Sequence, residues 1–167
     1  MAVVGAGTMG TGIARVFADA RTSVRLAARR ESSLKAARSR LGDTAPRVRL
    51  TTAVDEALDG AELVVETIVE EIGAKRELLA RAEELAAPDA ILTTNTSSLP
   101  LAALSGGLAR PELFAGLHWF NPPELVELVE VVGGEGTAPE TLQTLAGWMT
   151  MSVSSGPTVR SYVLVLS

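Results

Sequence analysis

A glycine-rich turn constrains the fold of this chain more than any other feature of its sequence. The apolar run Ala2–Val4 predicts a short buried strand, and the pattern G-x-G-x-x-G follows it directly, before a helical pattern over residues 11–20. In this pattern the first glycine permits a tight turn, the second lets backbone amides approach a pyrophosphate, and the third lets the helix pack against the strand. The turn therefore predicts a dinucleotide site at a helix N-terminus. The residues expected to bind the cofactor here are Gly5, Gly7, Thr8, Met9 and Gly10.

Short apolar runs alternate with amphipathic segments along most of the chain. Further strands are expected over residues 23–28, 47–52, 61–69, 90–95, 113–120 and 125–132. Helices are expected over residues 31–41, 54–58, 74–86 and 138–149, with another beginning within residues 96–104. The alternation predicts an α/β fold of the Rossmann type, with a doubly wound, mostly parallel sheet and helices on both faces. Residues 1–167 are expected to form a single dinucleotide-binding domain.

The composition argues against several classes of function. The net charge of −5 disfavours binding to the phosphate backbone of nucleic acids. The chain has no cysteine and one histidine, which excludes thiolate nucleophiles and disfavours a metal site. No secretion signal is visible, and no apolar run approaches the roughly 18 residues of a transmembrane helix. We therefore expect a cytoplasmic protein without a metal or a membrane partner.

The end of the second expected strand carries arginines where an acidic residue is typical. About 20 residues after such a glycine turn, an Asp or Glu usually binds the ribose 2′-hydroxyl of NAD. This chain has Ala28 at that place, followed by Arg29 and Arg30. Guanidinium groups bind phosphate through paired donors, so the sequence favours NADP over NAD. The alternative is that both arginines are solvated charges at a strand end.

The single histidine, His118, lies in a second informative segment, GLHWFNPPELVELVEVV. Hydride transfer from an alcohol needs a base that titrates near neutrality, and histidine is the side chain whose ordinary pKa lies there. A carboxylate bonded to the second ring nitrogen fixes the tautomer of such a base. Glu127 and Glu130 are both candidates, but residues three positions apart on a strand face opposite sides, so at most one faces the site. The alternative is that His118 is a buried structural residue.

Several segments occur in the order found in 3-hydroxyacyl-CoA dehydrogenases. They are GAGTMGTGIA, ELVVETIVEE, TTNTSSLPL, GLHWFNPPELVELVEVV and GTAPET, and the likeness extends to about Trp148. The chain thus resembles the N-terminal, NAD(P)-binding domain of that family. The resemblance implies an oxidoreductase of fatty acid metabolism. It would interconvert 3-hydroxyacyl and 3-oxoacyl thioesters, linked to CoA or to acyl carrier protein, by hydride transfer with a nicotinamide cofactor.

The resemblance also implies roles for individual residues. His118 matches the family's general acid/base, and Glu130 matches the carboxylate that stabilises its imidazolium. Ser97 matches a hydroxyl that hydrogen-bonds the substrate oxygen, and Asn121 matches an amide near the reacting carbon. The positions that match residues beside the cofactor are Glu70, Lys75 and Asn95.

Each of these assignments has a structural alternative. Ser97 and Ser98 could cap a helix that begins in LPLAAL. The NPP segment could be only a rigid turn. The glutamates of VETIVEE could be exposed charges at a strand end. Trp119 and Phe120 are expected in the core or in a pocket wall.

The chain departs from the family pattern in three places. The region between the second and third strands is short where relatives carry a longer helical excursion that helps to hold coenzyme A, which leaves another acyl carrier open. The family's C-terminal helical domain is expected to be absent. Little chain precedes the first strand, so exposed apolar surface and a homo-oligomer are possible outcomes. The alternative function is a catalytically weak or inactive dinucleotide-binding module, or a truncated fragment of such an enzyme.

Overall fold

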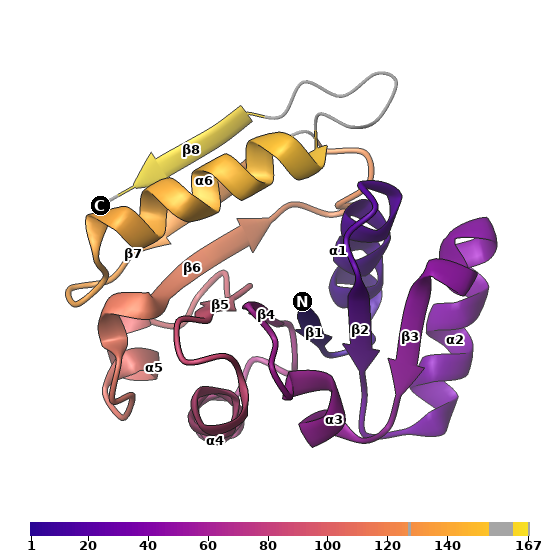
Figure 1. The fold of residues 1–167 in the computed structure, drawn as a ribbon, viewed down its shortest axis with the longest axis horizontal. Coiled ribbons are helices and arrows are strands. Elements are labelled where there is room, and N and C mark those ends of the chain that lie inside the picture. The colour runs from indigo at the N-terminus through magenta and orange to yellow at the C-terminus, as the bar shows by residue number, and fades with distance from the viewer. Residues whose placement is uncertain (127, 154–161, 167) are drawn as a thin grey trace.

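The chain forms one eight-stranded sheet covered by helices on both faces (Figure 1). The computed structural model describes residues 1–126, 128–153 and 162–166. The strand order is β3-β2-β1-β4-β5-β6-β7-β8. The strands are β1 (Ala2–Val4), β2 (Val24–Ala27), β3 (Val48–Thr51), β4 (Leu63–Glu66), β5 (Ile91–Thr94), β6 (Phe114–Trp119), β7 (Leu128–Gly133) and β8 (Tyr162–Leu166). All neighbours pair in parallel except β6 and β7, so the predicted Rossmann-type, mostly parallel sheet is confirmed.

The helices divide between two layers, one on each face of the sheet. One layer contains α1 (Thr8–Asp19), α2 (Glu31–Leu41) and α6 (Pro139–Val153). The other contains α3 (Val54–Leu58), α4 (Ile72–Leu85) and α5 (Leu101–Ser105). Short 3-10 helices, η1 (Gly42–Arg47) and η2 (Pro111–Leu113), precede β3 and β6. No helix within the described residues is long and apolar enough to cross a bilayer.

Strand β1 lies at the centre of the sheet and contributes to both hydrophobic cores. Val3 packs into the core under α1, whereas Ala2 and Val4 pack into the core under α3 and α4. Alternate side chains of a strand point to opposite faces, so a strand that is covered on both faces must be apolar throughout. All three residues are buried. The expectation of exposed apolar surface at the first strand is therefore wrong.

Strand β4 ends earlier than predicted, at Glu66 rather than at residue 69. Beyond it, the hydroxyl of Thr67 lies 2.9 Å from the carbonyl oxygen of Gly5 and 3.1 Å from that of Val4. Glu71 then caps α4 by accepting hydrogen bonds from two backbone N–H groups of the first turn. The apolar residues of TIV suggested a longer strand, but beyond Glu66 the chain contacts the glycine turn and then leads into the N-cap of α4.

Two helices are longer than their sequence patterns predicted. Helix α1 begins at Thr8 instead of residue 11, so the third glycine of the turn belongs to its first turn. Helix α6 continues past residue 149 to Val153. In α1, the helical hydrogen bonding begins before the apolar pattern because the first turn contains the third glycine, which is buried against the backbone of Gly5 without a side chain of its own.

The glycine turn depends on two residues that have no room for a side chain. Gly5 has φ +116°, a conformation that favours glycine. A Cβ on Gly10 would lie 1.9 Å from the carbonyl oxygen of Gly5 and 2.4 Å from the hydroxyl of Thr67. Gly7 differs, because a Cβ there would meet no atom within 4 Å. The first and third glycines therefore serve packing, and the second leaves open space in front of the helix.

This difference predicts that two alanine substitutions change the free energy of unfolding by very different amounts. Gly10→Ala should lower the free energy of unfolding by about 2–3 kcal/mol, because the added methyl group collides with the backbone of Gly5 and a shift of that backbone would strain the turn. Gly7→Ala is the matched control and should change stability by less than about 0.5 kcal/mol. Urea unfolding followed by circular dichroism measures both values. Equal losses in the two variants would contradict this account of the turn.

Candidate active site

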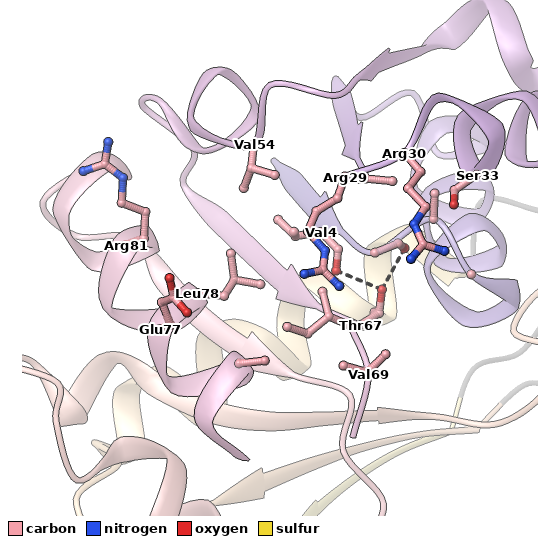
Figure 2. A pocket seen from close by; sticks show the side chains of 16 residues that line it. Val4, Arg29, Arg30, Ser33, Val54, Thr67, Val69, Glu77, Leu78 and Arg81 are labelled. Atoms are coloured by element: carbon pink, nitrogen blue, oxygen red, sulfur yellow. Dashed lines mark hydrogen bonds between the residues drawn. The ribbon is translucent and has the colours of Figure 1, made fainter. Parts of the chain in front are cut away.

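A cavity of about 540 Å³ lies at the carboxyl ends of β1, β2 and β4 (Figure 2). Its walls come from the glycine turn, from residues 28–30 after β2, from residues 67–69 after β4 and from one side of α4. The strand order changes direction between β1 and β4, and ligands of open α/β sheets bind at such a switch point. The position and size of the cavity therefore suit a nucleotide.

The N-terminus of α1 is suited to a diphosphate. Gly7 is the N-cap residue, no side chain caps this end, and Thr8 is exposed. Backbone N–H groups in the first turn of a helix have no partner within the helix, and the helix dipole favours an anion there. Together with the open space at Gly7, this arrangement fits the pyrophosphate of a dinucleotide.

Two exposed arginines and a serine line the part of the cavity next to β2. Arg29 and Arg30 follow the buried Ala28, and Figure 2 shows both among the lining side chains. Ser33, in the first turn of α2, lines the same cavity. The sequence analysis missed Ser33, although its spacing of three residues from Arg30 in a helix would have placed the two together. Arg29, Arg30 and Ser33 thus supply two guanidinium groups and one hydroxyl as hydrogen-bond donors. No carboxylate stands at the end of β2, where this chain has Ala28.

His118 lies in a chain of three side chains on neighbouring segments. Its Nε2 is 2.9 Å from the hydroxyl of Ser97, and its Nδ1 is 2.8 Å from a carboxylate oxygen of Glu130. In the antiparallel pair of β6 and β7, His118 and Glu130 lie directly opposite each other, so their side chains point to the same face. The side chains of His118 and Glu130 are 22% and 24% exposed, so the pair is reachable but mostly shielded from water. Glu127, the other predicted candidate, lies outside the described residues.

The hydrogen bonds assign the tautomer of the neutral histidine. An ionised carboxylate can only accept, so the Nδ1 of His118 must donate to Glu130. In the neutral ring Nε2 then carries the lone pair and accepts from the hydroxyl of Ser97. His118 can therefore take up a proton at Nε2 while Glu130 stabilises the resulting imidazolium.

The aromatic neighbours of His118 have different roles. Trp119 is buried and packs edge-on against Phe17, with ring centroids 5.9 Å apart, so it belongs to the core. Phe120 lies edge-on to the ring of His118, with centroids 4.7 Å apart, and forms a wall beside it. The amide oxygen of Asn95 accepts from the backbone N–H of Trp119 at 2.8 Å and so ties the end of β5 to β6.

The structure does not connect Asn121 to His118. Asn121 is exposed, and its side chain makes no hydrogen bond with any residue that the structure describes. It directly precedes a turn in which the backbone N–H of Leu125 donates to the carbonyl oxygen of Pro122 at 3.0 Å. The NPP segment is thus a turn, as the structural alternative expected, and a role for the Asn121 amide stays a prediction.

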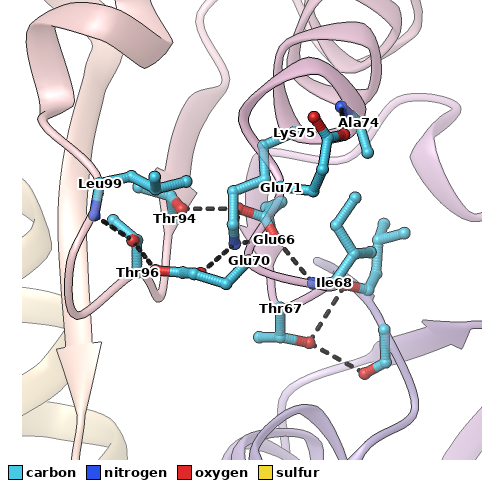
Figure 3. Close-up of polar contacts among 12 residues, drawn as sticks. Glu66, Thr67, Ile68, Glu70, Glu71, Ala74, Lys75, Thr94, Thr96 and Leu99 are labelled. Carbon is cyan, nitrogen blue, oxygen red and sulfur yellow. Dashed lines mark hydrogen bonds and ion pairs between the residues drawn. The ribbon is translucent and has the colours of Figure 1, made fainter.

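A buried ion pair lies between the cavity and the histidine. Lys75 and Glu66 are 1% and 0% exposed, and the ammonium group is 2.7 and 2.8 Å from the two carboxylate oxygens (Figure 3). The ammonium also lies 3.2 Å from Glu70. The hydroxyl of Thr94 and the backbone N–H of Ile68 donate to Glu66 as well, each at 2.6 Å. The expectation that the glutamates of this segment are exposed strand-end charges is therefore wrong for Glu66.

Neither serine of NTSS caps the following helix. Helix α5 has Pro100 as its N-cap residue and no side-chain cap. Ser98 instead donates to Glu70 at 3.0 Å, and Ser97 contacts His118. The capping alternative is therefore wrong, because the proline delays the start of the helix beyond the reach of either hydroxyl. No group of three or more His, Asp or Glu residues that could hold a metal occurs within the described part of the chain.

The buried pair generates a prediction on stability. Lys75→Met should lower the free energy of unfolding by about 3–5 kcal/mol, since it leaves the Glu66 carboxylate buried without its counter-charge. The double variant Glu66→Gln with Lys75→Met should lose less than the sum of the two single variants. Urea unfolding of the parent, the two single variants and the double variant measures the four free energies of this double-mutant cycle. Additive losses would show that the two side chains act independently.

Arg81→Met provides the control for the loss of a cation. Arg81 forms an exposed ion pair with Asp55 at 2.7 Å, which water and salt screen. Its loss should affect stability far less than the loss of Lys75.

Comparison with known proteins gives a consistent result. A family model described as the NAD-binding domain of 3-hydroxyacyl-CoA dehydrogenase matches residues 1–48 and 37–154. A probable 3-hydroxyacyl-CoA dehydrogenase of Caenorhabditis elegans is 34% identical over 169 residues, covering 87% of this chain and 55% of the relative. The 3-hydroxyadipyl-CoA dehydrogenase of Escherichia coli is 37% identical over 162 residues, covering 87% of this chain and 34% of the relative.

A solved structure supports the same relationship. The crystal structure of 3-hydroxybutyryl-CoA dehydrogenase from Escherichia coli has a TM-score of 0.86 and 32% sequence identity, and the match covers 98% of this chain and 37% of that one. The chain thus spans between about a third and a little over half of the length of these relatives.

Proposed function

This chain belongs to the 3-hydroxyacyl-CoA dehydrogenase family, as its NAD-binding domain, and from that premise we propose that it carries the proton-transfer residues as well as the cofactor site of a dehydrogenase. The reaction would interconvert a 3-hydroxyacyl and a 3-oxoacyl thioester. The observation that carries this proposal is the chain of hydrogen bonds from Ser97 through His118 to Glu130.

In the oxidative direction the imidazole acts as the base. When bound, the nicotinamide cofactor supplies the acceptor or donor of hydride. His118 accepts at Nε2 the proton of the 3-hydroxyl group, and Glu130 stabilises the positive ring that results. When the substrate binds, the Ser97 hydroxyl donates to the same oxygen instead of to Nε2, which frees the lone pair of that nitrogen and holds the oxygen next to it. In the reductive direction His118 returns the proton to the oxygen of the ketone.

The cofactor proposal rests on the charge at the end of β2. Arg29 and Arg30 provide paired donors for a ribose 2′-phosphate, and Ser33 supplies a hydroxyl beside them. Ala28 stands where a carboxylate would bind the 2′-hydroxyl of NAD and repel a phosphate. These residues support NADP(H) as the preferred cofactor.

The acyl carrier is coenzyme A or acyl carrier protein. The relatives named for acyl-CoA substrates support CoA. Between β2 and β3 this chain has only α2 and the 3-10 helix Gly42–Arg47. The relatives' longer helical excursion at this place is expected to help hold coenzyme A, so the short connection here supports use of a second carrier, acyl carrier protein. Rates of NADH and NADPH oxidation with acetoacetyl-CoA, compared with acetoacetyl-acyl carrier protein, distinguish the two carriers.

His118→Ala tests the proton-transfer role. The variant should reduce turnover of acetoacetyl-CoA about a thousandfold, because it removes the general acid, and should leave the Kd for the reduced cofactor within about twofold. Steady-state absorbance and cofactor fluorescence titration measure the two quantities. Unchanged turnover would exclude His118 as the acid/base.

Replacing both arginines tests the cofactor preference. Arg29→Asp with Arg30→Ala should weaken NADPH about tenfold or more, since the aspartate repels the 2′-phosphate and both cationic donors are lost, while NADH binding changes little. Fluorescence titration with each cofactor gives the comparison. An equal loss for NADH and NADPH would refute the phosphate role.

A second candidate function is a dinucleotide-binding module with little or no catalytic activity. It is considered because the cavity of about 540 Å³ is lined by other residues than Ser97, His118 and Glu130, so a cofactor could be held there without any catalysis at the histidine. Cofactor binding without turnover of any 3-oxoacyl thioester would support this candidate over the first.

A further inference from the structure

The loop that carries Ser97 is held on both sides by a single carboxylate. This loop, residues 95–100, joins β5 to α5, and Glu70 contacts it from the loop between β4 and α4. One oxygen of Glu70 accepts from the hydroxyl of Thr96 and, at 3.0 Å, from that of Ser98. Ser97 therefore lies between two anchored neighbours, and its own hydroxyl contacts His118 (Figure 3 shows the Thr96 side).

Thr96 also folds the loop upon itself. Its hydroxyl oxygen accepts from the backbone N–H of Leu99 at 3.0 Å and from that of Ser98 at 3.3 Å. A hydroxyl that accepts backbone hydrogen bonds two and three residues ahead stabilises a tight local turn. The anchor from Glu70 thus acts on a preformed turn and fixes its place next to β6.

Glu70 in turn contacts the buried ion pair of Lys75 and Glu66 through the ammonium of Lys75. Its second oxygen lies 3.2 Å from the ammonium of Lys75, which also contacts both oxygens of Glu66. Partial burial acts to raise the pKa of Glu70, but hydrogen bonds from two hydroxyls and from Lys75, with the charge of that lysine, outweigh it and hold the pKa below its usual range. Glu70 therefore remains an ionised acceptor near neutral pH.

We infer that Glu70 is a positioning residue of the dehydrogenase. Through Thr96 and Ser98 it holds the loop that places the Ser97 hydroxyl against His118. This inference rests on the proposed function for its catalytic meaning. This role is separate from the contact with the cofactor that the sequence predicts for Glu70, which stays a prediction. In the structure one oxygen of Glu70 contacts the loop and the other contacts Lys75.

His118 is the one histidine of the chain, so the NMR signals of its imidazole report on the contact with Ser97 without any substrate. Because the chain has one histidine, its imidazole signals in a nitrogen-15 NMR spectrum are assigned without ambiguity. Ser97→Ala removes the hydroxyl at Nε2 and defines the change in chemical shift that follows from loss of this contact. Ser98→Ala removes one anchor alone, and the double variant Thr96→Val with Ser98→Ala removes both anchors together with the hydrogen bonds that Thr96 accepts within the turn. The single variant should shift the His118 signals in the direction of that change, and the double variant should reproduce it in the cofactor-free protein.

A positioning role lowers kcat and leaves the Kd for the cofactor unchanged, whereas a cofactor contact raises that Kd. The Thr96→Val, Ser98→Ala variant should lower kcat for acetoacetyl-CoA at least about tenfold, since displacement of a reacting group by about 1 Å costs up to about a hundredfold. Its Kd for NADH should stay within about twofold of the parent value. Glu70→Gln should lower kcat and shift the His118 signals in the same way, and the double variant still decides the question if Glu70→Gln fails to fold.

Conservative and distant substitutions serve as controls. Thr96→Ser with Ser98→Thr retains both hydroxyls and should keep the parent spectrum and kcat. Ser105→Ala, at the end of α5, removes a hydroxyl that contacts only the carbonyl oxygen of Ala102 at 3.5 Å and should change neither.

The outcomes distinguish this inference from the proposed function. If the anchor variant leaves the His118 signals unchanged while Ser97→Ala shifts them, or if Ser97→Ala shifts nothing, positioning by Glu70 is overturned. If the anchor variant loses NADH binding as strongly as turnover, Glu70 and its loop serve the cofactor and the inference is again wrong. An absence of turnover in the parent protein defeats the proposed function only, because the NMR comparison is made without substrate.

Discussion

The buried ion pair between Glu66 and Lys75 is the interaction on which the arrangement of the site depends. It lies at the carboxyl end of β4, beside the point where the strand order reverses. Two buried charges are tolerated only when each is paired and hydrogen-bonded, and here the partners come from α4, from β5 through Thr94, and from the backbone of Ile68. Satisfying one carboxylate therefore fixes three segments relative to one another, and Glu70 extends the same network to the loop of Ser97.

The antiparallel pairing of β6 and β7 has a comparable consequence for proton transfer. A continued parallel order would place a crossover connection between the two strands, whereas the antiparallel pair brings residues 118 and 130 directly opposite each other. The histidine and its carboxylate thus belong to a rigid ladder, which limits the movement of the imidazole. The cofactor cavity, in contrast, lies among loops at the carboxyl ends of parallel strands. One sheet carries both sites, because the strands that line the cavity, β1, β2 and β4, are parallel and the antiparallel pair of β6 and β7 lies further along the sheet.

Sequence patterns predicted most of the fold because each relevant signal was local. The glycine turn, the apolar strands and the alternation with helices all follow from neighbouring residues, and the structure confirms the sheet that they implied. The predictions that failed depended on distant contacts. Beyond Glu66 the hydroxyl of Thr67 bonds to the glycine turn, and the serines before α5 contact His118 and Glu70 rather than capping that helix. Glu66 looked like a strand-end charge because nothing nearby in the sequence shows that Lys75 covers it.

The sequence alone therefore determined the class of fold, the cofactor-binding turn and the identity of the one imidazole available for proton transfer. The family resemblance named Ser97 and Glu130 as site residues, but only the tertiary structure showed that both contact that imidazole, one at each ring nitrogen. Ser97 lies 21 positions and Glu130 12 positions away in the chain, and the anchor of the serine loop, Glu70, lies on a separate loop again. The reason is physical: hydrogen bonds of about 3 Å are set by strand register and loop packing, which bring together residues whose spacing along the chain carries no record of their contact.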